Sequence, residues 1–266
     1  MPDEPVENIS GGTDGGSEAR FATGDPETRA EAVVDALGGI YWQKAYGGRE
    51  AFPCLVRTIL SQNTSDVASQ PAFDALIERY GDAGDLAATL AAADREAVAE
   101  VIQPAGLYNQ KSRVIQEAAE AVLADFGDAD AFDAFVREGD PEAVRERLLE
   151  MRGVGPKTAD CVLLFSGGRG GVFPVDTHVH RVARRMGLAP PDADHEGVRE
   201  ALETAVPTEK CGFGHTAMIQ FGREYCSARS PSCLDGPEAC PLADRCDRVG
   251  VDAGAGTVVD PADADG

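Results

Sequence analysis

LLEMRGVGPKTADCVLLFS, residues 148–166, is the stretch that decides the fold of this 266-residue chain. It consists of two apolar segments joined by Gly-Val-Gly-Pro-Lys. The pattern predicts one helix that stops at Gly153 and a second that begins at Pro156, because the first position of a helix tolerates proline. Gly155 permits a tight reversal between the helices. The exposed N–H groups of such a turn suit a phosphate, and the turn presents Lys157.

Helix signals recur along the rest of the chain, whereas strand signals are rare. Capping residues such as Asp25 and Asp140 precede segments in which apolar residues follow a helical spacing. The sequence therefore predicts an all-α fold, in which Pro71 either kinks a helix or delays its start. The expected helices cover roughly residues 25–38, 52–60, 66–80, 85–92, 94–102, 109–126, 131–138, 141–151, 156–165, 177–186, 196–206 and 214–225.

The chain is strongly acidic, with 24 basic and 46 acidic residues and a formal net charge of -22. Seven acids and one arginine in residues 1–28 contribute -6, and five acids and one arginine in residues 247–266 contribute -4, which leaves -12 on the body. Such a charge argues at first against nucleic acid as a partner. Lysine, however, occurs at only four positions, and an acid-rich, lysine-poor chain resembles proteins of halophilic organisms. At molar salt the Debye length is about 3 Å, so local contacts decide binding.

Both ends of the chain are polar and have little to bury. Residues 1–24 and 250–266 are rich in Gly and Asp, so we expect them to be disordered. The N-terminus has neither the basic nor the apolar region of a secretion signal. No apolar run approaches the roughly 18 residues that would span a bilayer. We therefore expect a cytoplasmic protein without membrane contacts.

The hairpin resembles the helix-hairpin-helix of DNA repair glycosylases. Gly-Val-Gly-Pro-Lys-Thr-Ala, together with Val-Asp-Thr-His at residues 175–178, is similar to the endonuclease III family in particular. The resemblance runs from about residue 30 to 246. It implies two helical lobes that flank a DNA cleft: a six-helix barrel with the hairpin over residues 48–170, and an iron-sulfur lobe from residues 25–47 and 171–249.

The resemblance implies that Lys157 is the catalytic nucleophile and that Asp176 assists it. In bifunctional members of the family, the lysine at this place displaces a damaged base, forms a Schiff base with the sugar and cuts the strand by β-elimination. Such an amine must be neutral when it attacks, and the helix macrodipole favours the free amine of Lys157. Asp176 alone reads as the N-cap of a helix, which is compatible with the family role. The adenine glycosylases of the superfamily lack this lysine and place a glutamate on an earlier helix. Residues 55–60 contain no carboxylate, so the sequence does not resemble that class.

Two further segments resemble loops with which the family handles DNA. An enzyme that acts on a base inside a duplex must extrude it and fill the hole, at a cost of roughly a few kcal/mol. Residues 61–64 resemble the loop whose glutamine fills the space, and residues 106–109 resemble the loop that pushes an apolar side chain into the opposite strand. Taken alone, the first segment could be helix capping and the second a core anchor. The expected DNA-contacting residues are Gln62, Asn63, Leu107, Tyr108, Asn109, Gly153, Gly155 and Arg229.

Four of the seven cysteines, Cys226, Cys233, Cys240 and Cys246, cluster near the C-terminal end with gaps of six, six and five residues. Such a group in a cytosolic chain indicates a metal site rather than two disulfides. Zinc is an alternative, but zinc sites usually contain a Cys-x2-Cys pair, and the sequence has none. The pattern for a [4Fe-4S] cluster in the family is Cys-x6-Cys-x2-Cys-x5-Cys. The resemblance therefore implies such a cluster, with a middle gap four residues wider and a local bulge at Gly236-Pro237.

These features predict a DNA N-glycosylase with AP lyase activity that acts on oxidised or otherwise damaged pyrimidines in base excision repair. Its expected partner is double-stranded DNA with a damaged base or an abasic site, and we expect a monomer. One alternative is a mismatch thymine or uracil DNA glycosylase of the same fold. Another is a non-catalytic iron-sulfur DNA-binding protein, against which the joint presence of Lys157 and Asp176 argues.

Overall fold

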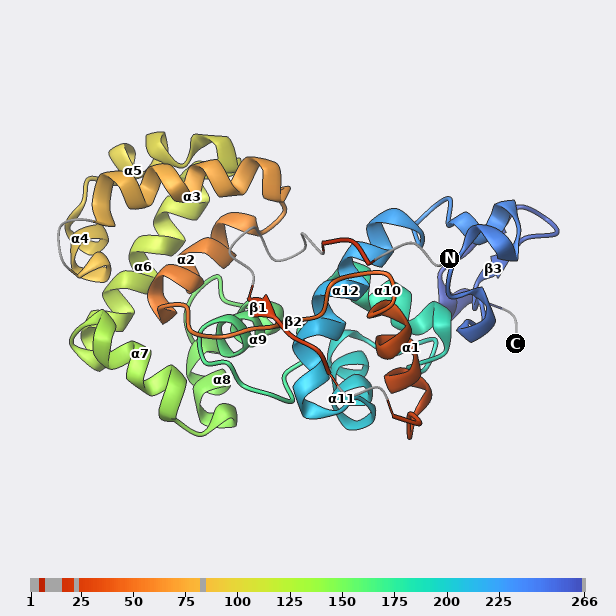
Figure 1. The fold of residues 1–266 in the computed structure, drawn as a ribbon. Helices are drawn as coiled ribbons and strands as arrows, with labels where there is room; N and C mark the ends of the chain where they lie inside the picture. The colour runs from red at the N-terminus through yellow and green to blue at the C-terminus, as the bar shows by residue number, and fades with distance from the viewer. Residues whose placement is uncertain (1–4, 8–15, 22–23, 82–84, 265–266) are drawn as a thin grey trace. The chain divides into compact units, whose positions relative to one another are not determined.

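The computed structural model describes residues 5–7, 16–21, 24–81 and 85–264. Within this part of the chain lie twelve α-helices and four strands of two residues each, which confirms the predicted all-α class (Figure 1). No helix in the described part is both long and apolar enough to cross a membrane. The chain divides into two compact units, a hairpin unit, Tyr46–Arg169, and a cysteine unit, Met1–Ala45 with Gly170–Gly266.

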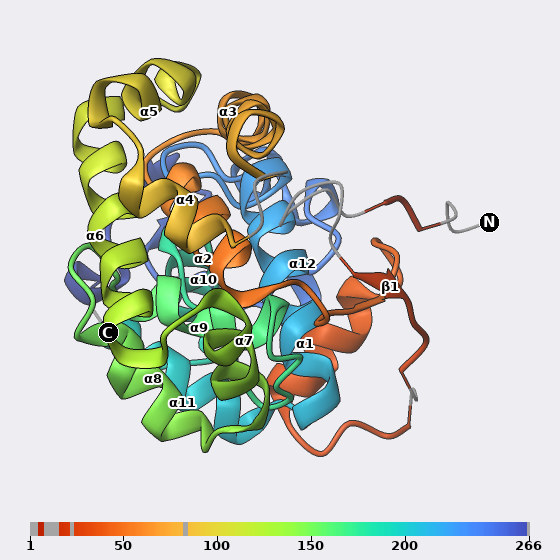
Figure 2. The ribbon, with the colours of Figure 1, turned by 90° about the vertical axis from the view of Figure 1, so that its left-hand side faces the viewer.

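The hairpin unit is built around one central helix, α2 (Ala51–Ser61). Nearly every residue of α2 is buried, because α3, α6, α7 and α9 pack around it (Figure 2). A helix that is apolar on all sides is typical of such a central position. The described residues of the unit contain eight α-helices: besides α2 they are α3 (Asp66–Tyr80), α4 (Leu86–Ala92), α5 (Arg95–Val101), α6 (Tyr108–Phe126), α7 (Ala129–Glu138), α8 (Pro141–Leu149) and α9 (Pro156–Phe165).

Aspartate caps begin several of these helices. Asp85, Asp94 and Asp140 each accept a hydrogen bond from the backbone N–H three residues further on, so α4, α5 and α8 start where the sequence predicts. Helix α3 covers Asp66–Tyr80, as predicted, so of the two alternatives for Pro71 the delayed helix start is wrong. Pro71 lies on the exposed side of α3.

The cysteine unit contains α1 (Arg29–Leu37), α10 (Thr177–Met186), α11 (His195–Ala205) and α12 (Cys211–Glu224). Its central helix is α12, which packs against α1 and α10 and is buried from Cys211 to Gly222. Gly214 permits close packing there, because a Cβ atom at this position would lie 2.8 Å from a ring carbon of Phe173. Helix α10 packs against the same core through Val179, Val182 and Ala183.

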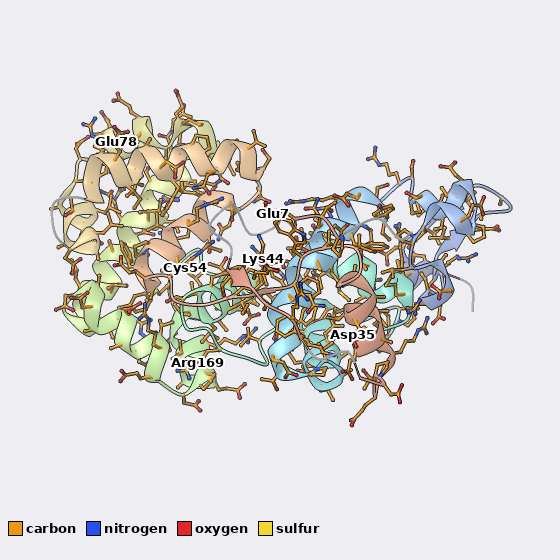
Figure 3. All side chains as sticks on the ribbon, in the orientation of Figure 1. Glu7, Asp35, Lys44, Cys54, Glu78 and Arg169 are labelled. Atoms are coloured by element: carbon orange, nitrogen blue, oxygen red, sulfur yellow. The ribbon has the colours of Figure 1, made fainter. Side chains whose placement is uncertain are left out.

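The described parts of both chain ends differ from the predicted disorder. At the N-terminal end, β1 (Ser17–Glu18) pairs with β2 (Lys44–Ala45), and Glu7 forms an ion pair with Lys44 at 3.1 Å (both labelled in Figure 3). Composition predicts little burial for such a segment, but backbone pairing and a buried cation hold it to the body. The rest of the predicted N-terminal tail, residues 1–4, 8–15 and 22–23, lies outside the described residues.

The C-terminal end is ordered in a similar way. Strand β3 (Val251–Asp252) pairs antiparallel with β4 (Thr257–Val258), and a 3-10 turn follows at Pro261–Asp263. Asp260 forms an ion pair with the buried Arg184 of α10. The predicted disorder over residues 250–266 must therefore be corrected for residues 250–264, because one carboxylate and a short hairpin attach them to the cysteine unit. Residues 265–266 are not among those described.

The reversal between α8 and α9 depends on Gly153. Its φ angle is +78°, and a Cβ atom at this position would lie 2.7 Å from a methyl carbon of Val114 in α6. Gly155 instead has an extended backbone with φ -98°, and a Cβ atom there would meet no atom within 4 Å. The residue that makes the reversal possible is therefore Gly153, and not Gly155 as the sequence predicts.

This difference between the two glycines gives a test of the hairpin. Gly153→Ala should lower the free energy of unfolding by roughly 2–4 kcal/mol, because it adds left-handed strain and a contact with Val114. Gly155→Ala is the matched control and should change it by less than about 1 kcal/mol. Urea unfolding of both variants checks this. Equal destabilisation by the two substitutions would contradict the assigned roles.

Candidate functional site

Lys157 is the second residue of α9 and is half-buried. Its amine lies within electrostatic reach of the Cys54 thiol in α2 (labelled in Figure 3), which packs against α9. Burial raises the pKa of Cys54 to about 12, and the positive charges of Arg49 and Lys157 oppose that rise. The Lys157 side chain thus lies near a buried part of the hairpin unit, at a helix N-terminus.

Asp176 is the N-cap of α10, as its position predicts. Its Oδ1 atom accepts hydrogen bonds from the backbone N–H groups of His178 and Val179, both at 2.8 Å. Asp176 belongs to the cysteine unit, whereas Lys157 belongs to the hairpin unit. His178 lies next to Arg181, whose Nη2 atom is 3.1 Å from its Nδ1 atom, and burial lowers the pKa of His178.

The structure ties Gln62 to the hairpin. The side-chain Nε2 atom of Gln62 donates hydrogen bonds to the carbonyl oxygen of Gly153 and to the Thr158 hydroxyl, both at 3.1 Å. Thr158 directly follows Lys157 in α9. The next loop residue, Asn63, is exposed and has a left-handed backbone with φ 52°. Two segments that are 91 residues apart in sequence therefore meet at this turn.

Leu107 also has a left-handed backbone, with φ 48°, directly before α6. This conformation costs a leucine about 1–2 kcal/mol. Its side chain is nevertheless 56% exposed, and the neighbouring Tyr108 is 37% exposed. The core-anchor alternative is therefore wrong for Leu107, and Asn109 is exposed as well. Val67, in the first turn of α3, is 87% exposed and is a further apolar surface residue that the sequence patterns did not single out.

Lys111 lies inside the hairpin unit, with only 3% of its surface exposed. Its amine donates hydrogen bonds to the carbonyl oxygen of Leu60 at 2.7 Å, to the Thr64 hydroxyl at 2.8 Å and to the carbonyl oxygen of Ala105 at 3.0 Å. A lysine ammonium has three hydrogens to donate, so these contacts use all of them. Burial lowers the pKa of Lys111 from 10.5 to about 8.

Lys111 should make stability depend on pH. Because its pKa is lower in the folded chain than in the unfolded chain, the unfolded chain takes up the proton first as the pH falls. The free energy of unfolding of the wild type, relative to that of Lys111→Met, should therefore rise by about 1–3 kcal/mol between about pH 8 and pH 10.5. Urea titrations of both proteins across this range measure the difference. A difference that does not change with pH would contradict the buried amine.

The four clustered cysteines line one cavity, together with Arg185 and Arg248. The widened gap after Cys233 is taken up by two successive 3-10 turns, Ser232–Asp235 and Pro237–Ala239, in place of a simple bulge. Gly236 joins the turns with φ +123°. Cys240 therefore lines the same cavity as the other three cysteines.

Among the described residues, no three His, Cys, Asp or Glu side chains form a group that could hold a metal ion.

The surroundings of this cavity are positively charged. The Nη1 atom of Arg185 lies 3.6 Å from the Cys226 sulfur, and the backbone N–H of Arg248 donates to the Cys246 sulfur at 3.3 Å. The Nε atoms of both arginines are buried without a hydrogen-bond partner. Burial raises the pKa of Cys246 to about 11. Four thiols beside the cations Arg185 and Arg248 are residue types that an anionic metal-sulfur group would require.

Arg185 also shapes the loop between the first two cysteines. It donates hydrogen bonds to the carbonyl oxygens of Ser227 at 2.6 Å and Ala228 at 2.7 Å. The next residue, Arg229, is exposed at the end of this anchored segment. One buried arginine thus joins the wall of the cavity to the loop that was predicted to contact phosphate.

Residues 56–208 match the family described as HhH-GPD superfamily base excision DNA repair protein. The chain is 31% identical to Endonuclease III of Thermotoga maritima, over 74% of this chain and 83% of that protein. It also resembles the solved structure of a non-covalent Endonuclease III-DNA complex, with a TM-score of 0.67 and 27% identity over 83% of this chain and 96% of that chain. A trapped Endonuclease III-DNA covalent intermediate gives a TM-score of 0.63 at 28% identity, over 83% of this chain and 91% of that one. The chain therefore belongs to the endonuclease III family of the HhH-GPD superfamily of base excision DNA repair proteins.

Proposed function

We propose that this chain is a bifunctional DNA N-glycosylase and AP lyase whose nucleophile is the amine of Lys157. Its family makes it a DNA glycosylase of base excision repair. The lyase step rests on one observation: the single lysine of the hairpin is half-buried at the N-terminus of α9, next to the turn that binds Gln62. A covalent intermediate with DNA has been trapped for a structural relative, which supports the same chemistry here.

In this mechanism the amine of Lys157 attacks C1′ of an extruded deoxynucleotide. The new N–C1′ bond forms as the bond from C1′ to the damaged base breaks, and the base leaves with a proton. The sugar ring then opens to a Schiff base, and loss of a proton from C2′ breaks the C3′–O bond by β-elimination. The first step requires the neutral form of the amine, and the amine belongs to the second residue of α9, at the positive end of that helix. The carboxylate of Asp176 would stabilise positive charge on the sugar and accept protons.

The exposed apolar residues support base extrusion as the step before the chemistry. Leu107 and Tyr108 offer apolar surface that could enter the opposite strand, while Gln62 and Asn63 could fill the vacated position. Duplex DNA with a damaged pyrimidine or an abasic site is the substrate that this arrangement and the family resemblance favour. A panel of duplexes with single defined lesions, including mismatched thymine and uracil, would identify the preferred base.

Borohydride trapping on abasic duplex DNA tests the nucleophile. The wild type should give a covalent adduct, and Lys157→Ala should give none while it still binds DNA, because only the amine forms a reducible Schiff base. Arg152→Ala removes an exposed cation from the same turn and should retain the adduct. An adduct with the Lys157→Ala protein would overturn the assignment.

Asp176→Asn preserves the helix cap but removes the negative charge. In the same trapping experiment it should slow adduct formation by about tenfold or more.

We further propose that Cys226, Cys233, Cys240 and Cys246 hold a [4Fe-4S] cluster. Their shared cavity, the neighbouring cations Arg185 and Arg248, and the first and last cysteine gaps, which equal those of the family pattern, support this. The cluster would stabilise the loop that bears Arg229 and take no part in bond cleavage. The tightly held carbonyl groups of Ser227 and Ala228 would then set the direction in which Arg229 points.

Spectroscopy of the purified protein tests the cluster. The wild type should be brown, with a broad absorbance in the blue region and with bound iron and sulfide, because iron-sulfur charge transfer absorbs visible light. Cys240→Ser should lose this absorbance. Cys211→Ser changes an isolated buried thiol of the same unit and should keep it. A colourless protein that contains zinc would refute the proposal.

A further inference from the structure

The two loops that carry the proposed extrusion residues are held together by one buried amine. We propose that Lys111 is a positioning residue, which locks the loop of residues 61–65 to residues 105–107 so that both act on DNA as one rigid element. This inference rests on the proposed function, because it takes base extrusion as the work of the two loops.

The contacts of Lys111 come from three separate segments of the chain. Leu60 is at the end of α2, Thr64 lies in the loop that follows, and Ala105 ends the 3-10 turn (Gln103–Ala105) before Leu107. The Thr64 hydroxyl accepts a hydrogen bond from Lys111 and donates one to the carbonyl oxygen of Ala105 at 2.5 Å. Lys111, Thr64 and Ala105 therefore form a closed triangle of hydrogen bonds between the two loops.

A charged group at this position is not needed for packing alone. An apolar side chain of similar length would fill the space without the cost of burying an ammonium group. The amine instead fixes the positions of its hydrogen-bond acceptors, because a buried donor whose hydrogens are all bonded holds those acceptors in one arrangement. The acceptors of Lys111 are two backbone carbonyl groups and one hydroxyl, so it fixes the path of the main chain.

The fixed main chain is strained on either side of the triangle. Asn63 and Leu107 are the two non-glycine residues of the described hairpin unit that have positive φ angles. Asn63 directly precedes Thr64, and Leu107 follows Ala105 by two residues. Such backbone strain persists only where neighbouring contacts enforce it. Lys111 and Thr64 are well placed to keep the Leu107 side chain directed outward.

The same bonds extend to the hairpin. Gln62 lies between Leu60 and Thr64, both held by Lys111, and its own side chain bonds to Gly153 and Thr158. Hydrogen bonds thus run without interruption from the hairpin turn, through the loop of Gln62, to the residues before Leu107. The bonds from Gln62 to Gly153 and Thr158 do not involve Lys111, so loss of the amine should loosen Thr64 and Ala105 while the turn that carries Lys157 stays in place.

Lys111→Met, which keeps the length of the side chain and removes its three donors, tests this role. A duplex with 2-aminopurine opposite an abasic site reports insertion of the extrusion residues as a rise in fluorescence. The variant should lose most of that rise and trap duplex DNA with borohydride about tenfold more slowly. On single-stranded abasic DNA, which has no opposite strand to enter, its trapping rate should equal that of the wild type. Amide exchange should be faster in residues 62–65 and 105–108.

Two further variants make the outcome specific. Gln116→Met is a matched control on the same helix, because Gln116 is buried and donates to the carbonyl groups of Leu90 and Ala93, away from both loops. It should leave fluorescence and duplex trapping unchanged. Thr64→Val removes the hydroxyl of the triangle but keeps Lys111, and it should reproduce the selective loss on duplex DNA.

The outcomes separate this inference from the proposed function. Equal trapping of duplex DNA by Lys111→Met and the wild type would overturn the positioning role, and so would an equal loss on duplex and single-stranded DNA. If the wild type forms no adduct on either substrate, the proposed lyase function fails. The fluorescence of the wild type and of Lys111→Met then still decides whether Lys111 positions the loops.

Discussion

The close approach of Gly153 to Val114 is the contact on which the rest of the hairpin unit depends. A left-handed glycine without a Cβ atom allows the chain to reverse against α6, and this reversal sets the start of α9. Lys157 is the second residue of α9, so the reversal also determines where Lys157 lies. The carbonyl group of Gly153, exposed by the same turn, receives the side chain of Gln62. One backbone conformation therefore positions both the proposed nucleophile and a proposed extrusion loop.

Although the chain is acidic, its buried positive charges each lie among acceptor groups. Lys44, Lys111 and Lys210 are buried, and each has acceptor groups around its amine. Arginine supplies the remaining positive charge, as Arg185 and Arg248 do at the cysteine cavity. We propose that contacts with phosphate therefore come from backbone N–H groups and arginines at particular places, and not from a broad basic surface. Such contacts suit a protein whose long-range field repels DNA.

Local signals predicted the helices well because each one is contained in a few neighbouring residues. Aspartate caps located the starts of α4, α5 and α8, and the motif that surrounds Lys157 gave the family. Signals that depend on distant residues were missed. Gly153, and not Gly155, is the position that excludes a side chain, because its φ angle is positive and Val114, 39 residues earlier in the chain, lies next to it. The bonds of Lys111 to Leu60 and Thr64, and the ion pair that attaches the C-terminal segment to Arg184, could not be predicted for the same reason: these partners are distant in sequence.

The burial of the lysines has a practical consequence for chemical labelling. Three of the four amines are enclosed among their acceptors, whereas Lys157 is half-buried. A reagent that acylates amines would therefore react with Lys157 ahead of the other three lysine side chains. In most proteins such a reagent modifies many surface lysines, but in this chain acylation located at Lys157 by mass spectrometry would report on the state of the hairpin turn, and bound DNA would be seen as protection of that one lysine.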